Sequence, residues 1–370
     1  MSINSKILIM CQQVPPSNCH KVTVEVHKNI EALRQAWKHL DEVASMLIAR
    51  GELRYINYSF YQTYGWNAFL AETYRHSFRG KPEFVEVLVD GDTRIILPLF
   101  VEKCKKRVRF LSGRIAGILN AVCPYQDDES GEAFKALLRF LKDHYGKGWN
   151  IRLQDMPRYS LLMKTLESEG FAFSERGSFH VPLTDFSTYE DYLSSLGKNI
   201  YKNIRKSYNH LTTDGKEMNL AVYDTKNPPS RPLLREVWTL YYRRKLAWKH
   251  KKQSFLNNLI CRLRGSRQAS NGRQTISMLR LEESRLYVLT INGKLAAFMH
   301  VYLHEGHALM PKLAIDVTYS RYSPGILMVL ETLKMLMAEG VKDFDMCRGE
   351  ERYKTEVGGL MEPLSSVSLS

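Results

Sequence analysis

The sequence lacks long apolar runs, paired cysteines and any spacing of histidines typical of a metal site. No apolar stretch approaches the roughly 20 residues that a membrane-spanning helix needs, and Ile7–Cys11 is too short for the core of a signal peptide. The six cysteines are scattered without a CxxC pair, which is typical of reduced thiols in a cytosolic protein. We therefore expect a cytoplasmic protein with no metal site and no transmembrane segment.

Acidic residues are scarce in one long stretch of the chain. Between Lys198 and Arg280 there are nineteen Lys or Arg residues and only four Asp or Glu, so this stretch carries a net charge of +15 while the whole chain carries +14. Such a concentration of positive charge indicates a polyanionic partner, such as a phosphorylated cofactor, tRNA, an acidic glycan or a membrane surface. A basic face that only keeps the protein in solution would have the same composition.

The order of predicted elements occurs twice along the 370 residues, a length that favours two domains. A β-hairpin, a helix and a further strand are predicted in the first half (Phe84–Val89, Arg94–Val101, Ala133–His144, Asn150–Leu153). The second half repeats the pattern around the turn signal Asn292-Gly293 (Leu286–Ile291, Lys294–Leu303, Ala308–Ile315, Pro324–Glu339, Asp343–Cys347). We expect an α/β fold of two related modules, each a mixed sheet with flanking helices, spanning 1–185 and 186–370.

Other segments connect these elements. The strand His180–Leu183 is expected to close the first module, and Ser187–Leu211 reads as one basic helical arm. Gly265–Arg273 is predicted to be an exposed loop.

The start of the second predicted helix has the features of an anion site. Ser323 is a favourable N-cap, and Pro324 suits the first helical position, where its missing N–H would have no partner. Gly325 lets a ligand approach the backbone, so the N–H groups of Gly325, Ile326 and Leu327 would face a pyrophosphate, with Arg321 adding a charge-assisted contact. An ordinary well-capped helix is the alternative.

A second set of polar residues follows the last predicted strand. Phe344 and Met346 alternate with Asp343, Asp345 and Cys347, and the chain then turns at Gly349 toward Tyr353 and Lys354. After a strand–helix–strand crossover, these polar groups would converge near the helix N-terminus, although a solvated charged loop is the alternative. Cys347 has no local histidine partner, so the sequence does not favour a covalent mechanism.

These motifs, in this order, resemble one family of acyltransferases. Ser323-Pro324-Gly325 before a long helix, Gly340, Phe344-Asp345, Arg348-Gly349-Glu350 and Tyr353-Lys354 resemble the cellulose-biosynthesis-associated GNAT acyltransferases of the CelD/BcsL type. That family is similar to tandem-GNAT proteins, including the Fem-type aminoacyl transferases. The resemblance implies two GNAT-like domains in tandem, with acyl-CoA bound where the fourth and fifth strands of a sheet splay apart.

The implied activity is direct transfer of an acyl group, most simply acetyl, from acyl-CoA to an amine or hydroxyl acceptor, in polysaccharide or cell-envelope biosynthesis. Direct transfer needs donors for the thioester carbonyl, an acid for the leaving thiolate and a base for the acceptor. Tyr353 is the expected acid, with the neighbouring Lys354 expected to lower its pKa. Candidates for the base are Asp316, Asp345 and Glu350, with the lone His300 a weaker option. The predicted cofactor-binding residues are Arg321, Ser323, Gly325, Ile326, Leu327, Arg348 and Lys354.

The first half offers a poor second donor site. Its helix follows the acidic segment Asp127–Glu132, which would repel phosphates, so residues 1–185 are expected to serve as scaffold and acceptor wall. Two alternatives remain open. A Fem-like transferase would hold aminoacyl-tRNA on the basic stretch 198–280. A catalytically inactive module would instead bind an anionic lipid or glycan.

Overall fold

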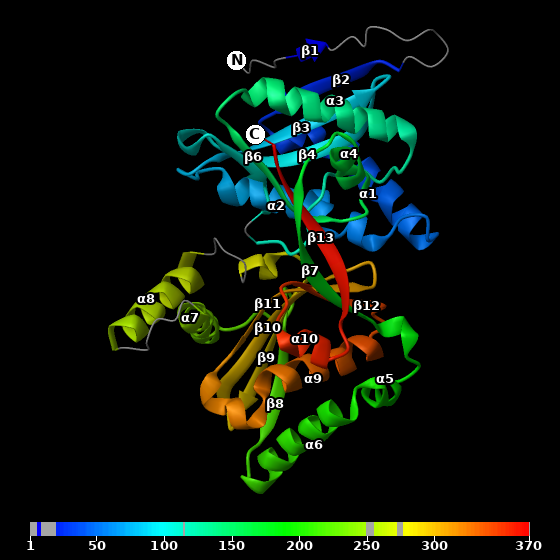
Figure 1. The fold of residues 1–370 in the computed structure, drawn as a ribbon. Coiled ribbons are helices and arrows are strands. Elements are labelled where there is room, and N and C mark those ends of the chain that lie inside the picture. The colour runs from blue at the N-terminus through cyan, green and yellow to red at the C-terminus, as the bar shows by residue number, and fades with distance from the viewer. Residues whose placement is uncertain (1–5, 9–19, 114, 249–254, 272–276, 370) are drawn as a thin grey trace. The chain divides into compact units, whose positions relative to one another are not determined.

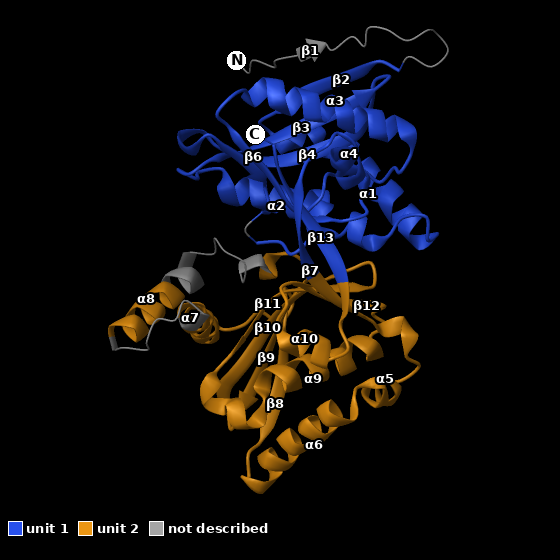
Figure 2. Cartoon of the chain, viewed as in Figure 1, with its two compact units in different colours: residues 1–177, 362–370 blue, residues 178–361 orange. Residues whose placement is uncertain are grey.

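The computed structural model describes residues 6–8, 20–113, 115–248, 255–271 and 277–369, and it divides the chain into two compact units (Figure 2). Unit 1 comprises residues 1–177 and 362–370, and unit 2 comprises residues 178–361. The division thus lies a few residues before the expected junction at 185/186. It also differs in that the last nine residues belong to unit 1.

Unit 1 is a mixed sheet with helices, in the strand order β1-β2-β3-β4-β5-β6-β13 (Figure 1). Neighbouring strands are antiparallel except β5 and β6, which are parallel. The strands are β1 (Lys6–Leu8), β2 (Val22–His27), β3 (Lys81–Val89), β4 (Asp92–Glu102), β5 (Arg107–Phe110), β6 (Asn150–Pro157) and β13 (Leu360–Leu369). The helices are α1 (Arg34–Ala49), α2 (Tyr64–Tyr74), α3 (Asp128–Tyr145) and α4 (Leu161–Ser168).

Unit 2 has the strand order β7-β12-β11-β10-β9-β8, in which only β11 and β12 are parallel. Its strands are β7 (Phe173–Pro182), β8 (Met218–Tyr223), β9 (Ser284–Ile291), β10 (Lys294–His304), β11 (His307–Ile315) and β12 (Asp343–Arg348). Its helices are α5 (Tyr189–Ser195), α6 (Lys198–Thr213), α7 (Arg231–Trp248), α8 (Phe255–Asn271), α9 (Pro324–Ala338) and α10 (Arg352–Glu356).

Most locally encoded elements of unit 2 lie where the sequence predicts them. Asn292 and Gly293 both have positive φ, as a type I′ turn requires, and they join β9 to β10. The expected basic arm, however, is broken at Leu196–Gly197 into α5 and α6. The expected loop at Gly265–Arg273 is also wrong as far as Asn271, because those residues continue α8; residues 272 and 273 lie outside the described residues.

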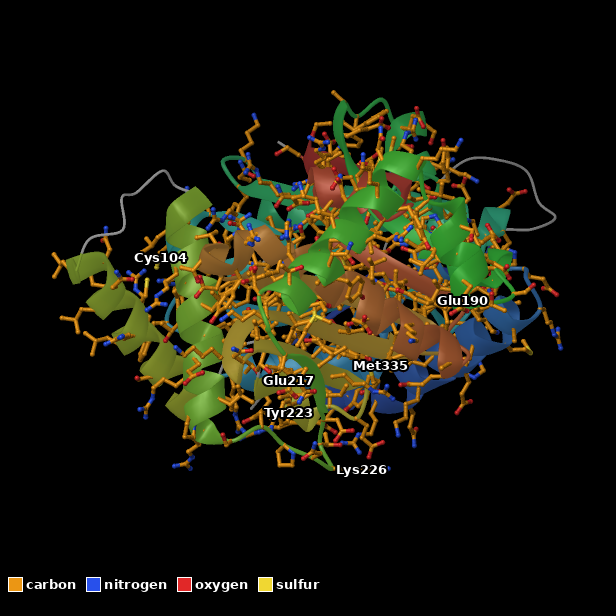
Figure 3. All side chains as sticks on the ribbon, turned by 90° about the horizontal axis from the view of Figure 1, so that it is seen from below. Cys104, Glu190, Glu217, Tyr223, Lys226 and Met335 are labelled. Atoms are coloured by element: carbon orange, nitrogen blue, oxygen red, sulfur yellow. The ribbon has the colours of Figure 1, made fainter. Side chains whose placement is uncertain are left out.

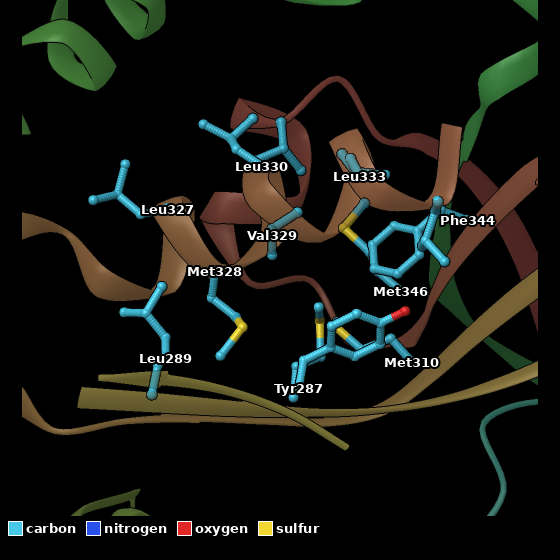
Figure 4. Close-up of a cluster of buried hydrophobic side chains, with 14 of the residues drawn as sticks. Tyr287, Leu289, Met310, Leu327, Met328, Val329, Leu330, Leu333, Phe344 and Met346 are labelled. Atoms are coloured by element: carbon cyan, nitrogen blue, oxygen red, sulfur yellow. The ribbon is translucent and has the colours of Figure 1, made fainter. Parts of the chain in front are cut away.

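The two faces of the unit 2 sheet bury different sets of side chains. Along β9, Tyr287 and Leu289 pack beneath α9, while Leu286 and Val288 pack against α7, since successive strand residues face opposite sides. Figure 4 shows the first set, in which Met328 of α9 points toward Tyr287 and Leu289 of the sheet. On its outer side α9 leaves Met335 36% exposed (Figure 3). The core therefore fixes which face of each strand meets α9 and which meets α7.

Candidate functional site

Strands β11 and β12 separate partway along their length. Their parallel pairing covers only His307–Leu309 and Asp343–Asp345. Beyond that point β11 continues to Ile315 beside β10, and β12 continues to Arg348 beside β7. A β-bulge in β11 around Pro311, which has no N–H to donate, accompanies the separation. An opening in the sheet therefore lies between residues 310–315 and 346–348.

The N-terminus of α9 follows the far end of β11, but its geometry differs from the expected N-cap. Ser323 has the left-handed conformation (φ 49°), and its side chain caps no helical N–H. Its carbonyl oxygen instead accepts from the N–H groups of Ile326 (3.0 Å) and Leu327 (3.1 Å). The expectation that three amides face a ligand is therefore wrong for these two, and among the described residues only the Gly325 N–H of this turn has no backbone acceptor.

Arg321 is held by an acidic residue that the sequence did not single out. Its Nε lies 2.8 Å from Oδ2 of Asp214, which also accepts from the hydroxyl of Tyr322 at 2.9 Å. Hydrogen bonds from Arg321 and then Tyr322 lower the pKa of Asp214. Because Asp214 ends α6, this cluster ties the 3₁₀-helix Val317–Tyr322 to α6 and places the Arg321 guanidinium two residues before Ser323.

Asp316 lies at the end of β11 and has a structural role there. Its Oδ1 accepts from the backbone N–H of Thr318 at 2.9 Å and from the Thr318 hydroxyl at 2.7 Å, so it caps the 3₁₀-helix. It also lines a cavity of about 480 Å³ together with basic side chains of α7 and α8, among them Arg235, Arg243 and Arg262. Asp316 therefore shares this cavity with several arginine side chains.

Asp345 borders the opening at the last residue of β12 that pairs with β11. Its Oδ1 accepts from the Cys347 N–H at 2.5 Å and from the Ser178 hydroxyl at 3.3 Å. Burial and then the charge of Asp343 raise the pKa of Asp345 to about 7. Since Phe344 and Met346 point toward α9, the carboxyl group of Asp345 lies on the α7 side of the sheet. A pKa of about 7 suits proton transfer at neutral pH.

Asp343 belongs to the same face. Although burial acts to raise the pKa of Asp343, a hydrogen bond from His180 (2.7 Å) and the nearby His307 ring, whose Nδ1 lies 4.0 Å from Oδ2, hold it below the ordinary value. Asp343 thus stays ionised beside Asp345, and its charge is part of the reason that Asp345 holds its proton.

The segment after β12 corrects two expectations. The Lys354 ammonium is buried and donates to the carbonyl oxygens of Cys347 (2.8 Å), Arg348 (3.0 Å) and Gly349 (3.1 Å). It therefore organises the turn that follows β12, and its donors are taken by these carbonyls rather than offered to a phosphate. Burial, then Glu351 and Cys347, raise the pKa of Tyr353, so the expected lowering by Lys354 is wrong.

The remaining predicted residues differ in setting. Glu350 is exposed in the loop after β12, and Arg348 is partly buried at the end of that strand. His300 lies in the core, bonded to Ser284 at 2.7 Å, and burial keeps its pKa well below the ordinary value. Sequence reasoning missed Lys312, which lies on β11 at the opening. The signal available was a lone lysine directly after Pro311 in an otherwise apolar strand.

The β11–β12 opening and the N-terminus of α9 both lie within the part of the chain that a protein-family model matches. Residues 198–355, all within unit 2, match the family model described as the acetyltransferase (GNAT) domain. No curated protein matches the chain.

Two solved structures resemble the chain over most of its length. The crystal structure of FemX is 11% identical, covers 89% of this chain and 95% of its own, and has a TM-score of 0.53. A tandem GNAT protein from the clavulanic acid biosynthesis pathway is 11% identical, covers 93% of this chain and 98% of its own, and has a TM-score of 0.52. The chain therefore has the fold of tandem GNAT proteins, and its GNAT domain supports an acetyltransferase-type enzyme. Among the described residues, no helix is both long and apolar enough to cross a membrane.

Proposed function

We propose that unit 2 transfers an acyl group from acyl-CoA to an amine or hydroxyl acceptor, as the CelD/BcsL-type resemblance implies. The observation that carries the proposal is the opening between β11 and β12. Residues 310–315 of β11 have no pairing partners on β12. The pantetheine arm of acyl-CoA would pass through this opening, and the pyrophosphate would bind at Gly325 with Arg321 beside it. The Lys354 ammonium and the amides of Ile326 and Leu327 have protein partners and are not part of the proposed donor site.

Asp345 and Tyr353 are the residues proposed to move protons, Asp345 as a base and Tyr353 as the acid. Asp345, with a pKa of about 7, exchanges a proton at neutral pH, and Tyr353 donates to the leaving thiolate. Acceptors of a sugar or cell-envelope class fit the resemblance.

The donor site is tested by two variants at one position. A Cβ at residue 325 would lie 3.2 Å from Cγ2 of Ile315, so Gly325→Ala measures the steric effect alone. Gly325→Glu adds a carboxylate where the pyrophosphate would bind, and we expect it to abolish acetyl-CoA binding while Gly325→Ala retains it. Calorimetric titration measures the affinity, and in the parent a saturating ligand at 100 times its Kd raises stability by about 2.7 kcal/mol. Equal affinity in both folded variants would remove the donor site from α9.

A Fem-like transferase is the second candidate, because α6 presents an uncompensated basic surface. Lys198, Lys202, Arg205 and Lys206 are all exposed, and none has an ion pair among the described residues. Tyr201, which is 42% exposed, lies among them and offers a ring for stacking on a base. Aminoacyl-tRNA would then replace acyl-CoA as the donor, and stabilisation of the protein by tRNA but not by acetyl-CoA would favour this candidate.

A further inference from the structure

Lys312 is a lysine of the central sheet that has no acidic partner. It is partly buried on β11, three residues beyond the last residue of β11 that pairs with β12. Within the described parts of the chain, its ammonium makes no hydrogen bond and no ion pair. The ring of Tyr241 on α7 lies nearby, with its centroid 6.0 Å from Nζ of Lys312. A cation in this position has lost part of its hydration without gaining a counter-charge.

The charged and titratable groups that face Lys312 come from three elements. Helix α7 contributes Tyr241 and Lys245, and Lys245 Nζ lies 6.0 Å from the centroid of the same ring. Strand β12 contributes Cys347 and Arg348 from the other side of the opening, and β10 contributes His300. Burial, then the charge of Lys245, lowers the pKa of Lys312 to about 7, with Arg348 acting in the same direction and Cys347 against it. A large fraction of Lys312 is therefore an uncharged amine at neutral pH.

Lys312 and the N-terminus of α9 lie on opposite faces of the sheet. Ala314, two residues after Lys312, packs in the cluster beneath α7, so Lys312 points to that face as well. Ile315 points to the other face, where it meets Gly325 of α9. A donor that binds at Gly325 and passes through the opening would thus present its reactive end on the side of Lys312 and Asp345.

We propose that Lys312 is the base that accepts the proton of the acyl acceptor on the α7 side of the opening. The inference rests on the proposed acyl transfer, and it assigns the acceptor's proton to Lys312 in place of Asp345. As the acceptor nitrogen or oxygen forms its bond to the thioester carbonyl carbon, the Lys312 amine takes the acceptor's proton. The C–S bond breaks, the electron pair leaves with sulfur, and Tyr353 protonates the thiolate. Lys312 then gives its proton to water, and Tyr353 takes a proton back from water.

Competitive amine labelling tests the position of Lys312 without knowledge of the acceptor. A trace of acetic anhydride is reacted with the full chain across pH 5–10, and peptide mass spectrometry follows Lys312 and the exposed Lys294 of β10, which reports the reagent's own pH dependence. We expect the labelling of Lys312 to reach half its maximum near pH 7, and acetyl-CoA to suppress labelling of Lys312 but not of Lys294. Labelling of Lys312 that acetyl-CoA leaves unchanged, in protein shown by calorimetry to bind acetyl-CoA, overturns the proposal.

Turnover separates this proposal from the proposed function. The assay uses water as the acyl acceptor and measures the CoA thiol that acetyl-CoA releases. It is applied to Lys312→Arg and Lys312→Met, with Lys294→Met as control. Arginine stays charged and does not act as a base at neutral pH, so we expect Lys312→Arg to lose roughly 10²–10⁴ in kcat with an unchanged KM for acetyl-CoA. The rise of parent turnover through pH 7 should vanish in both Lys312 variants. Full turnover in a folded Lys312→Arg overturns Lys312 as the base while leaving acyl transfer intact, whereas absence of acetyl-CoA binding in the parent overturns both.

Discussion

Asp345 is a buried carboxyl group whose proton state is coupled to folding. Its raised pKa means that the folded state keeps the proton while the unfolded chain loses it, between about pH 4 and pH 7. The stability associated with the protonated form is therefore present at low pH and is lost as the pH rises through about 7. Asp345→Asn keeps an acceptor for the Cys347 N–H and removes the ionisation.

The parent loses stability as the pH rises from 4 to 7, whereas Asp345→Asn has no such ionisation. We therefore expect the free energy of unfolding of Asp345→Asn, relative to that of the parent, to increase over this range by at most about 4 kcal/mol. Denaturant unfolding at several pH values measures the difference. Glu350→Gln, at an exposed carboxylate of the following loop, is the matched control and should follow the parent. A difference between Asp345→Asn and the parent that does not vary with pH would contradict the assignment.

Tyr353 tests the chemistry at the leaving group. Its ring packs against the core beneath α9, so Tyr353→Phe keeps the packing and removes one oxygen. If the hydroxyl protonates the thiolate, turnover should fall by roughly 10²–10⁴ with unchanged acetyl-CoA affinity. Tyr201→Phe, at an exposed tyrosine of α6, should keep full turnover. A Tyr353→Phe enzyme that keeps its activity and loses only about 1 kcal/mol of stability would reduce the hydroxyl to a structural hydrogen bond.

Helix α6 is the element whose charge the fold leaves unbalanced. Replacing Lys202, Arg205 and Lys206 together by Gln removes three positive charges from an exposed face. If all three contact phosphates, the slope of log affinity for tRNA against log salt should fall in magnitude by about 2 to 3. Filter binding at several salt concentrations measures the slope.

The control for α6 removes the same charge elsewhere. Lys103, Lys105 and Lys106 are exposed in the turn between β4 and β5 of unit 1, and their change to Gln should leave the slope unaltered. Equal effects of the two triple variants would show attraction to net charge rather than binding by α6. Absence of tRNA binding in the parent would remove the Fem-like candidate.

Elements set by local signals could be predicted from the sequence, and those set by distant partners could not. The Asn292-Gly293 turn and the start of α9 at Pro324 depend on residues that are neighbours in the chain, and both lie where the sequence predicts them. The pairing of β7 with β12, by contrast, depends on residues that are far apart in the sequence. The strand expected to close the first module pairs with β12 through residues more than 160 positions away.

The same limit applies to the candidate site. Asp345 could be predicted because it follows a strand in a recognisable motif, but its pKa depends on burial that only the fold supplies. Asp214, which holds Arg321, is separated from it by more than 100 residues, and no spacing in the sequence connects the two. Lys312 was missed because a lysine in a strand usually faces water, and its surroundings come from α7, β10 and β12.

At the scale of the whole chain, β13 joins the end of the sequence to unit 1. Residues Leu364–Leu369 pair with Ile151–Pro157 of β6, and Leu364, Val367 and Leu369 are buried there. Deleting residues 362–370 would expose these contacts, at a cost of roughly 1.5–3 kcal/mol for each buried side chain. We expect hydrogen exchange at β6 amides to accelerate, while unit 2 retains its stabilisation by acetyl-CoA. The control changes Leu360 and Met361 to Ser; both are more than half exposed in the same strand. Unchanged exchange at β6 in the deletion would contradict this dependence.

The pairing of β6 with β13 also sets an order of events on the ribosome. Residues 151–157 emerge early, yet the strand that covers their edge is translated about 200 residues later, an interval of roughly 10 to 40 s at ordinary elongation rates. During that interval the nascent chain carries an open sheet edge, which is a template for pairing with another polypeptide. The yield of monomer should therefore increase with the spacing between successive ribosomes on the mRNA.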